Sequence, residues 1–326
     1  MIGRHLCDTY VGRGDSVMAL VRDPRAAEDL ARKRVSVITG DLMDEDAICR
    51  ACSNADVVFN LAGVLGRWGI PTSELELING WAAGQVVRCA ARAGAAKVVH
   101  TSTAGVSGPL PKDICVSEDY PPSPTTEYQR TKLGGEQAAL QAHRAVGMPL
   151  VIVRPAFVYG PGDMHKLPLF RAVAAGRMVL VDGGVSRVHP IFVDDVVSGM
   201  IAASEYGPGG GETYILAGGA PVAIRKLLAT IAWALAVPAP RFSLPGTVML
   251  ALARAAETVC RLGNKEPPLT CSRVKLLSEH YAYSIEKARS ELGFKPMVDL
   301  PGGMKRTVEW YLGRGLIRSQ RHRETC

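Results

Sequence analysis

Short apolar segments rich in β-branched residues alternate with longer segments of helical periodicity through the first half of the chain. This alternation restricts the choice of fold more than any other feature. The apolar segments contain few polar residues, which is typical of strands buried on both faces of a parallel sheet. Because right-handed crossover helices then cover both faces, the sequence predicts a doubly wound α/β sheet. The predicted strands are 16–21, 35–39, 57–61, 98–102 and 150–154, and the predicted helices are 24–33, 45–54, 80–93 and 127–146.

The second half has shorter elements separated by Gly and Pro, so the chain is expected to divide into two lobes. We expect a main domain over residues 1–160 and a smaller, mainly helical lobe over 161–326. Strands near 188–192 and 212–216 are expected to return to the main domain. The lobe's predicted helices are 193–205, 224–236, 248–262, 285–292 and 303–312.

The net charge of +7 is compatible with an anionic ligand, but the basic residues are dispersed. No basic stripe with interleaved aromatic residues occurs, so we expect no nucleic-acid partner. The one dense basic run is at the C-terminal end, where a solvated tail is predicted. It contains Arg314, Arg318, Arg321, His322 and Arg323.

The eight cysteines have irregular spacing, and Cys49 and Cys52 form a single CxxC without a second pair or a nearby histidine. We therefore expect thiols in a reducing compartment and no metal site. No signal peptide is recognised before the first helical pattern, and the apolar segment 248–262 contains Arg254 and Glu257 and is too short to span a bilayer. A cytoplasmic protein without a transmembrane segment is predicted.

A phenol and an ammonium group, Tyr128 and Lys132, are four residues apart in a predicted helix and therefore share one face. A nearby cation favours phenolate, so Lys132 is expected to lower the pKa of Tyr128 and make it a usable acid or base. Thr103 follows the predicted strand 98–102, at the edge where ligands of parallel sheets bind. Its hydroxyl could donate to a carbonyl oxygen, although capping of the next turn is the alternative role.

Further motifs follow in a fixed order, and together they resemble the extended short-chain dehydrogenase/reductase superfamily in its NAD-dependent epimerase/dehydratase branch. The resemblance covers essentially the whole chain. The motifs are Gly40-Asp41-Leu42, Asn60-Leu61-Ala62-Gly63, Asn79, Thr101-Ser102-Thr103, Tyr128 with Lys132, the segment 154–162, and the segment 189–196.

The resemblance implies a Rossmann-type main domain that binds NAD(P), and a substrate lobe. It implies that Thr103, Tyr128 and Lys132 are catalytic. The implied cofactor-binding residues are Gly3, Arg22, Asp41, Leu42, Leu61, Ala62, Gly63, Ser102, Tyr128, Lys132, Pro155, Ala156, Phe157 and Val158. Arg187 and His189 match positions where substrate contacts are common, and exposed loop residues are the alternative interpretation. Asp194 and Asp195 are expected to cap the helix that starts at residue 193.

Cofactor choice depends on the end of the second strand, where an acid favours NAD and an arginine can accept a 2′-phosphate. Arg22 comes first there, with Arg25 close behind, which favours NADP. Asp23 leaves NAD open.

The start of the chain departs from the family pattern. Gly3 matches the third glycine of GxxGxxG, while the preceding strand and the first two glycines are absent. We expect about ten residues of the dinucleotide fold to be missing. The missing strand would lie between the strands predicted at 16–21 and 57–61. Either a start codon assigned too late or a truncated chain with weak cofactor binding would explain this.

The last third is similar to the 3β-hydroxysteroid dehydrogenase-like subgroup, whose members oxidise ring alcohols of sterols and related hydrophobic molecules. The resemblance implies an oxidoreductase that interconverts a secondary alcohol and a ketone on a sterol-like small molecule. The alternatives are a nucleotide-sugar epimerase or dehydratase with the same triad, and a non-catalytic dinucleotide-binding protein. The family also implies a homodimer through helices 80–93 and 127–146. The apolar helix 248–262 is expected either to pack on its neighbours or to rest on a membrane surface.

Overall fold

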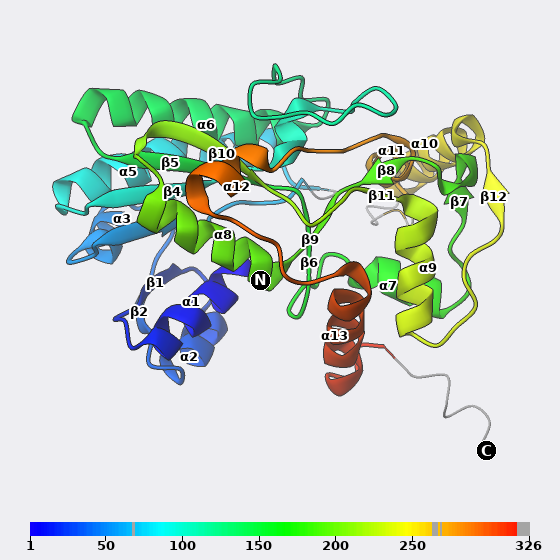
Figure 1. Cartoon of the computed structure of the whole chain (residues 1–326), viewed down its shortest axis with the longest axis horizontal. Helices are drawn as coiled ribbons and strands as arrows, with labels where there is room; N and C mark the ends of the chain where they lie inside the picture. The colour runs from blue at the N-terminus through cyan, green and yellow to red at the C-terminus, as the bar shows by residue number, and fades with distance from the viewer. Residues whose placement is uncertain (67–68, 263–266, 268, 318–326) are drawn as a thin grey trace.

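A parallel sheet forms the core of the main domain (Figure 1). The computed structural model describes residues 1–66, 69–262, 267 and 269–317. The four strands lie in the order β10 (Gly210–Leu216), β5 (Leu150–Pro155), β4 (Lys97–Thr101) and β3 (Val57–Asn60), and each neighbouring pair is parallel. The carboxyl ends of these strands therefore lie along one edge of the sheet, and β10 joins the first half of the chain to the second.

Helices cover both faces of this sheet. One face carries α3 (Glu45–Cys52), α5 (Ala82–Arg92) and α6 (Glu127–Val146), and the other carries α8 (Val193–Tyr206) and α12 (Glu286–Leu292). Val98 and Ile152 belong to the core under the first group, whereas Val99 and Val151 belong to the core under the second. Successive strand residues point to opposite faces, so each apolar strand contributes to two cores. The predicted doubly wound α/β class is confirmed.

The two strands nearest the N-terminus form a separate pair. They are β1 (Met18–Val21) and β2 (Ser36–Thr39), which are parallel to each other and lie beside α1 (Ile2–Arg13) and α2 (Pro24–Ala31) (Figure 1). Within the described residues, β1 and β2 are not hydrogen-bonded to β3. The ring of Tyr10 in α1 packs on Phe59 of β3, with centroids 5.6 Å apart. The sheet is therefore interrupted between β1 and β3, which is where the sequence predicts the absent strand.

The C-terminal lobe contains short strands and helices around its own core. The strand β6 (Phe157–Tyr159) precedes this lobe and pairs with β9 (Pro190–Phe192). The other elements of the lobe are α7 (Leu167–Ala174), β7 (Leu180–Val181), η3 (Asp182–Gly184), β8 (Arg187–Val188), β11 (Val222–Ala223), α9 (Ile224–Ala234), β12 (Ser243–Leu244), α10 (Gly246–Leu262), α11 (Cys271–Ser278) and α13 (Leu300–Gly313). Phe170 of α7 and Tyr311 of α13 meet edge to face, 5.1 Å apart. Across the described chain, no helix is both long and apolar enough to cross a membrane.

The five predicted helices after residue 190 correspond to α8, α9, α10, α12 and α13, whereas α7 and α11 were not predicted. Both of these helices have eight residues. Residues 318–323 of the predicted basic tail lie outside the described residues.

Asp194 and Asp195 are not caps of α8, contrary to the prediction, because the N-cap of this helix is Phe192. Asp194 accepts hydrogen bonds from His5 in α1 at 3.0 Å and from Arg306 in α13 at 2.6 Å. Asp195 accepts from the backbone amides of residues 297 and 298. Both carboxylates therefore join α8 to other segments of the chain.

The close packing of α6 gives a first testable prediction. A Cβ added at Gly135 would overlap the backbone oxygen of Asn79, whereas one added at Gly134 would meet nothing within 4 Å. Gly135→Ala is expected to lower the free energy of unfolding by about 1–3 kcal/mol or more, because the helix must move away from its neighbour. Gly134→Ala, the matched control, should raise it by about 0.5–1 kcal/mol through helix propensity. Urea unfolding measures both, and equal effects would contradict the packing argument.

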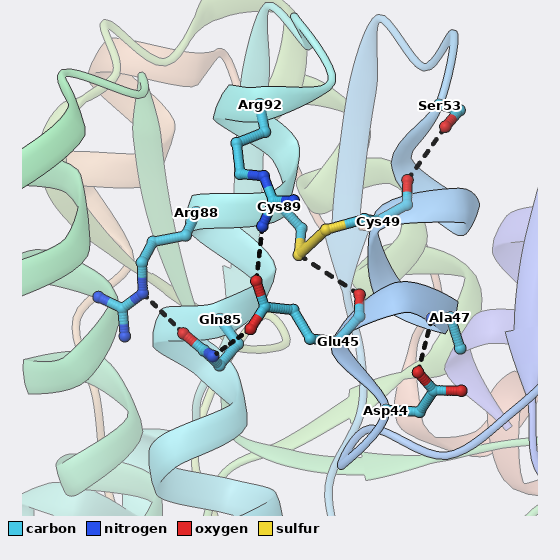
Figure 2. Close-up of a disulfide and its surroundings, with 9 residues drawn as sticks. All are labelled: Asp44, Glu45, Ala47, Cys49, Ser53, Gln85, Arg88, Cys89 and Arg92. Carbon is cyan, nitrogen blue, oxygen red and sulfur yellow. Dashed lines mark hydrogen bonds and ion pairs between the residues drawn. A yellow bond between two sulfur atoms is a disulfide. The ribbon is translucent and has the colours of Figure 1, made fainter.

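The cysteines do not all occur as thiols, which corrects the sequence prediction. Cys49 of α3 and Cys89 of α5 form a disulfide across 40 residues of sequence, with Cα atoms 4.8 Å apart (Figure 2). The prediction treated Cys49 and Cys52 as a sequence pair. In the fold, the side chain of Cys49 faces α5, while Cys52 is buried in the core beneath α3.

Candidate active site

Tyr128 and Lys132 lie one turn apart near the start of α6. The helix begins after Thr126, whose hydroxyl accepts from the Gln129 amide at 3.2 Å, while Gln129 Oε1 accepts from the Thr126 amide at 3.1 Å. This capping box fixes where the helix starts and therefore which face carries Tyr128 and Lys132. Lys132 is buried, and its Nζ donates to the carbonyl oxygen of Thr101 at 2.5 Å. Lys132 thus joins α6 to the carboxyl end of β4.

The segment 61–66, which follows β3, lies against the same face of α6. A Cβ added at Gly63 would be 3.7 Å from Lys132 Nζ, and one added at Gly66 would be 3.5 Å from Tyr128 Cβ. The structure therefore brings the predicted glycine-containing segment and the predicted acid/base pair together. Residues 61–66 belong to no helix or strand. Their contact with α6 therefore depends on the path of the loop backbone.

Asn79 holds this segment in place. It lies in the π-helical turn η1 (Glu76–Trp81), which continues α4 (Thr72–Leu75). Its Oδ1 accepts from the Val64 amide at 2.8 Å, and its Nδ2 donates to the Val64 carbonyl at 2.9 Å and to Thr131 Oγ1 at 3.0 Å. The motif pattern singled out Asn79 but gave it no role. The three hydrogen bonds show that it positions the segment after β3 on α6.

Thr103 lies just beyond β4, and its hydroxyl accepts from the Gly105 amide at 3.2 Å at the start of η2 (Ala104–Ser107). The proposed alternative, capping of the next turn, therefore occurs, while the hydroxyl hydrogen can still donate. Ser102 and Thr101 have buried hydroxyl oxygens without a hydrogen-bond partner in the described structure. Buried polar atoms without partners are costly, so these hydroxyls indicate a place for a polar ligand group.

Burial determines the electrostatics of the acid/base pair. It lowers the pKa of Lys132 to about 8, and the charge of Glu136 acts in the opposite direction. Burial also raises the pKa of Tyr128 to about 12. The expectation that Lys132 lowers the pKa of Tyr128 is therefore wrong for this structure. The ammonium group is directed at the Thr101 carbonyl, and desolvation of the phenol dominates.

The far end of the site is formed where β1 and β2 finish side by side. Arg22 follows β1, Asp41 follows β2, and the Arg22 Nη1 to Asp41 Oδ2 distance is 3.9 Å. Leu42 packs against the core under α3. Asp23 caps α2 by accepting from the Arg25 amide at 2.9 Å, so this carboxylate already has a partner. Two of the predicted cofactor residues, Arg22 and Asp41, are thus neighbours.

Gly3 lies in the first turn of α1, where an added Cβ would be 3.4 Å from Leu61 Cδ1. This places the start of α1 beside the segment after β3, as the motif register predicts. The predicted nicotinamide-lining residues span the end of β5 and the start of β6. They are Pro155, Ala156, Phe157 and Val158, of which Pro155 is buried and the others are partly buried.

The two predicted substrate residues lie in different environments. Arg187 is partly exposed in β8, whereas His189 is buried. His189 Nε2 lies 3.0 Å from the Gly218 carbonyl, and the Tyr283 amide donates to its Nδ1 at 3.3 Å. Burial lowers the pKa of His189 to about 4, so the ring is neutral at neutral pH. Both ring nitrogens are occupied by backbone groups.

A buried ion pair that was not predicted from the sequence lies behind the acid/base pair. Arg154 Nε and Nη2 donate to the two carboxylate oxygens of Glu136 at 2.9 and 2.7 Å. Glu136 follows Lys132 by one helical turn, and both partners are buried. The spacing of Glu136 from Lys132 was a visible signal, but its pairing with a residue on β5 depends on the fold.

The residues present fit a dinucleotide cofactor. Gly63 and Gly66 bring the backbone of this segment close to Lys132 and Tyr128, and the absence of side chains at these two positions suits close approach of a ligand to the backbone. The unpartnered Ser102 hydroxyl lies at the carboxyl end of β4, the edge where ligands of such sheets bind. These residues lie at one end of the candidate site, and Arg22 with Asp41 lie at the other end.

A family model described as "NAD dependent epimerase/dehydratase family" matches residues 1–217. The chain is 32% identical over 308 residues to a 4-hydroxy-2-methyl-3-oxo-4-farnesyl-3,4-dihydroquinoline-1-oxide ketoreductase of Stigmatella aurantiaca, covering 93% of this chain and 91% of the relative. It is 28% identical to 3beta-hydroxysteroid-dehydrogenase/decarboxylase isoform 1 of Arabidopsis thaliana, covering 92% of this chain and 73% of the relative.

Solved structures show the same fold. The crystal structure of gox2253 has a TM-score of 0.82 at 23% identity and covers 98% of this chain, with 97% of its own chain matched. A UDP-glucuronic acid 4-epimerase from Bacillus cereus, solved with NAD, has a TM-score of 0.76 at 22% identity, with 96% of each chain covered. The family match, the ketoreductase and sterol dehydrogenase relatives and the Rossmann-type sheet agree. The chain belongs to the NAD-dependent epimerase/dehydratase family of the extended short-chain dehydrogenase/reductases and is an NAD-dependent oxidoreductase.

Proposed function

We propose that this enzyme interconverts a secondary alcohol and a ketone on a hydrophobic, sterol-like substrate, with Thr103, Tyr128 and Lys132 as its catalytic residues. The observation that carries the proposal is the meeting of Lys132, Tyr128 and the segment 61–66 at the carboxyl edge of the sheet. When bound, the reduced nicotinamide supplies the hydride for the carbonyl carbon.

The protonation state of Tyr128 supports the reductive direction. With a pKa raised to about 12, the phenol is protonated at neutral pH and can donate its proton to the carbonyl oxygen. The hydroxyl of Thr103 donates a second hydrogen bond to the same oxygen. Lys132 would bind the ribose hydroxyls, and its contact with Thr101 keeps it at the end of β4.

The proposed cofactor site extends from this pair to the end of β1. The backbone of Leu61, Ala62 and Gly63 passes beneath the cofactor, and Ser102 supplies a free hydroxyl. Gly3 lies beside the pyrophosphate, the segment 155–158 lines the nicotinamide, and Asp41 with Leu42 binds the adenine. All of these residues lie on segments that the structure brings to the same edge of the sheet or to the ends of β1 and β2.

We propose a preference for NADP. Arg22 is exposed at the end of β1 and can reach a 2′-phosphate, whereas Asp23, the acid that would favour NAD, is engaged as the cap of α2. The Arg22 to Asp41 distance of 3.9 Å is long enough for the guanidinium to turn towards a ligand.

A hydrophobic substrate is favoured over a nucleotide sugar by the state of the two predicted substrate residues. A diphosphate group requires cations for binding. Of the two predicted substrate residues, His189 is neutral and enclosed, so only the partly exposed Arg187 could supply a positive charge. Relatives named as reductases of a farnesyl quinoline ketone and of 2-alkyl-3-oxoalkanoates support an apolar ketone.

The proposal also includes the domain division, the localisation, the oligomeric state and the membrane contact. We propose a dinucleotide-binding domain over residues 1–160 and a substrate lobe over 161–326, in a cytoplasmic homodimer that pairs through α5 and α6. In α10, Met249 and Ala253 are buried, while Val248, Leu252 and Val259 are exposed. The helix thus packs on its neighbours with one face, and its other face supports peripheral contact with a membrane surface.

The test uses the purified full chain with NADPH or NADH and, in separate reactions, a ketosteroid, a long-chain 3-oxo acid and UDP-glucose. We expect oxidation of NADPH by an apolar ketone, measured by the absorbance of the reduced nicotinamide, and slower oxidation of NADH. UDP-glucose should give neither oxidation nor interconversion. Interconversion of the sugar without net change in the nicotinamide would instead establish the epimerase alternative.

A further inference from the structure

The Cys49–Cys89 disulfide is not used by the proposed reaction. It links α3 to α5 (Figure 2), and its two cysteines differ in exposure. Cys89 is fully buried, whereas Cys49 is partly exposed. We therefore expect an attacking thiolate to approach from the side of Cys49, with the buried Cys89 as the leaving group.

The reduced state is also accommodated. The Cys89 sulfur lies 3.7 Å from the backbone oxygen of Glu45, so a Cys89 thiol could donate a hydrogen bond to this oxygen (Figure 2). The Glu45 carboxylate accepts from Arg92 Nη1 at 2.6 Å and from Gln85 Nε2 at 3.2 Å. These contacts keep α3 beside α5 without the covalent bond, so breaking it need not unfold the domain.

The third nearby cysteine does not take part. Cys52 is buried on α3, and burial raises its pKa to about 11, which suppresses the reactive thiolate. It therefore provides a matched control on the same helix as Cys49.

The disulfide lies close to the proposed nucleotide site through α3. A Cβ added at Gly40, just after β2, would be 2.7 Å from the Cβ of Ala47 in α3. The turn that carries Asp41 and Leu42 is therefore packed directly on this helix. Asp44, two residues after Leu42, caps the helix by accepting from the Ala47 amide at 3.0 Å. Small movements of α3 must move this turn.

We propose that Cys49 and Cys89 form a reversible thiol–disulfide exchange site for small thiols and disulfides of the glutathione class, and that its state sets how firmly the turn at residues 40–42 is held. A thiolate attacks the Cys49 sulfur, the bond to Cys89 breaks, and Cys89 leaves with the electron pair and takes a proton. A second thiol then releases Cys49 as a thiol. The protein gains two hydrogens, and the two small thiols become one disulfide.

The first experiment tests the exchange itself, without any cofactor. The full chain is equilibrated with reduced or oxidised glutathione, denatured and alkylated, and its mass is measured. EDTA is present throughout, because the ligand atoms of Glu45, Cys49 and Cys89 lie within 4.8 Å of one another and could bind a metal ion. We expect two fewer labels in the oxidised sample, located at Cys49 and Cys89. Equal labelling, or a Cys49–Cys52 pair, would overturn the proposal.

The second experiment tests the coupling. Amide hydrogen exchange in the peptide containing residues 40–42 should become at least about tenfold faster on reduction, since a disulfide restricts local opening. Cys52→Ala should show the same response, while Cys49→Ser should show the fast rate in both buffers. Unchanged exchange in wild type would overturn the coupling. The Kd for NADPH, which rests on the proposed function, should rise severalfold on reduction. If NADPH does not bind in either state while the exchange readouts change, only the proposed function fails.

Discussion

Replacement of Tyr128 by phenylalanine is expected to lower kcat for ketone reduction by about 10²–10⁴-fold. The substitution removes only the phenolic oxygen, which is the proton donor in the proposed reaction. The site should otherwise be preserved, because Tyr128 Oη has no hydrogen bond among the described contacts whose loss would disturb the fold. Steady-state turnover of an apolar ketone with NADPH measures the effect, and the Kd for NADPH should stay within about twofold of wild type.

Tyr206 provides a control, since it lies at the end of α8 and is 65% exposed. Tyr206→Phe should leave kcat and KM unchanged. If Tyr128→Phe retained wild-type turnover, Tyr128 would have to be removed from the mechanism. If it lost NADPH binding together with turnover, its role would be to hold the cofactor.

Glu136→Gln is expected to lower the free energy of unfolding by about 3–5 kcal/mol. Glu136 accepts both hydrogen bonds of the Arg154 guanidinium at a site where both side chains are buried. Without the carboxylate, this guanidinium is left as an uncompensated buried charge, with the Lys132 ammonium close by. Urea unfolding at neutral pH measures the change.

The matched control is an exposed ion pair of similar length. Arg289 and Glu286 are 2.9 Å apart, with both side chains about half exposed or more. Glu286→Gln should change the free energy of unfolding by no more than about 0.5 kcal/mol. The double replacement Glu136→Met with Arg154→Met should recover most of the lost stability, because no charge then remains buried. A cost for Glu136→Gln as small as that of Glu286→Gln would contradict the argument.

Much of the main domain could be predicted because its strands and helices are specified by patterns within short stretches of sequence. The apolar runs became β1 to β5, and the helical patterns between them became α2, α3, α5 and α6. The pairing of Tyr128 with Lys132 follows from helix geometry, and the approach of Gly63 follows from the way parallel strands end at one edge. These features depend on residue spacing, which the sequence displays directly.

The features that were missed depend on contacts between distant segments. The partner of Cys49 is on another helix, and the irregular spacing of the cysteines predicted thiols instead of a disulfide. The raised pKa of Tyr128 results from desolvation, which a sequence does not show. The enclosure of His189 by Gly218 and Tyr283 likewise depends on how the lobe folds back on β8 and β9.

The interruption between β1 and β3 also affects how the molecules behave towards one another. Within the described residues, each of these strands has a neighbour on one side only, so each presents a row of backbone donors and acceptors along the other side. Residues of both strands are partly exposed to solvent. Unprotected strand edges are templates for pairing with a second chain, and proteins normally shield them. We therefore expect the colloidal stability of this protein to depend on α1, whose Tyr10 packs on Phe59 at the edge of the main sheet.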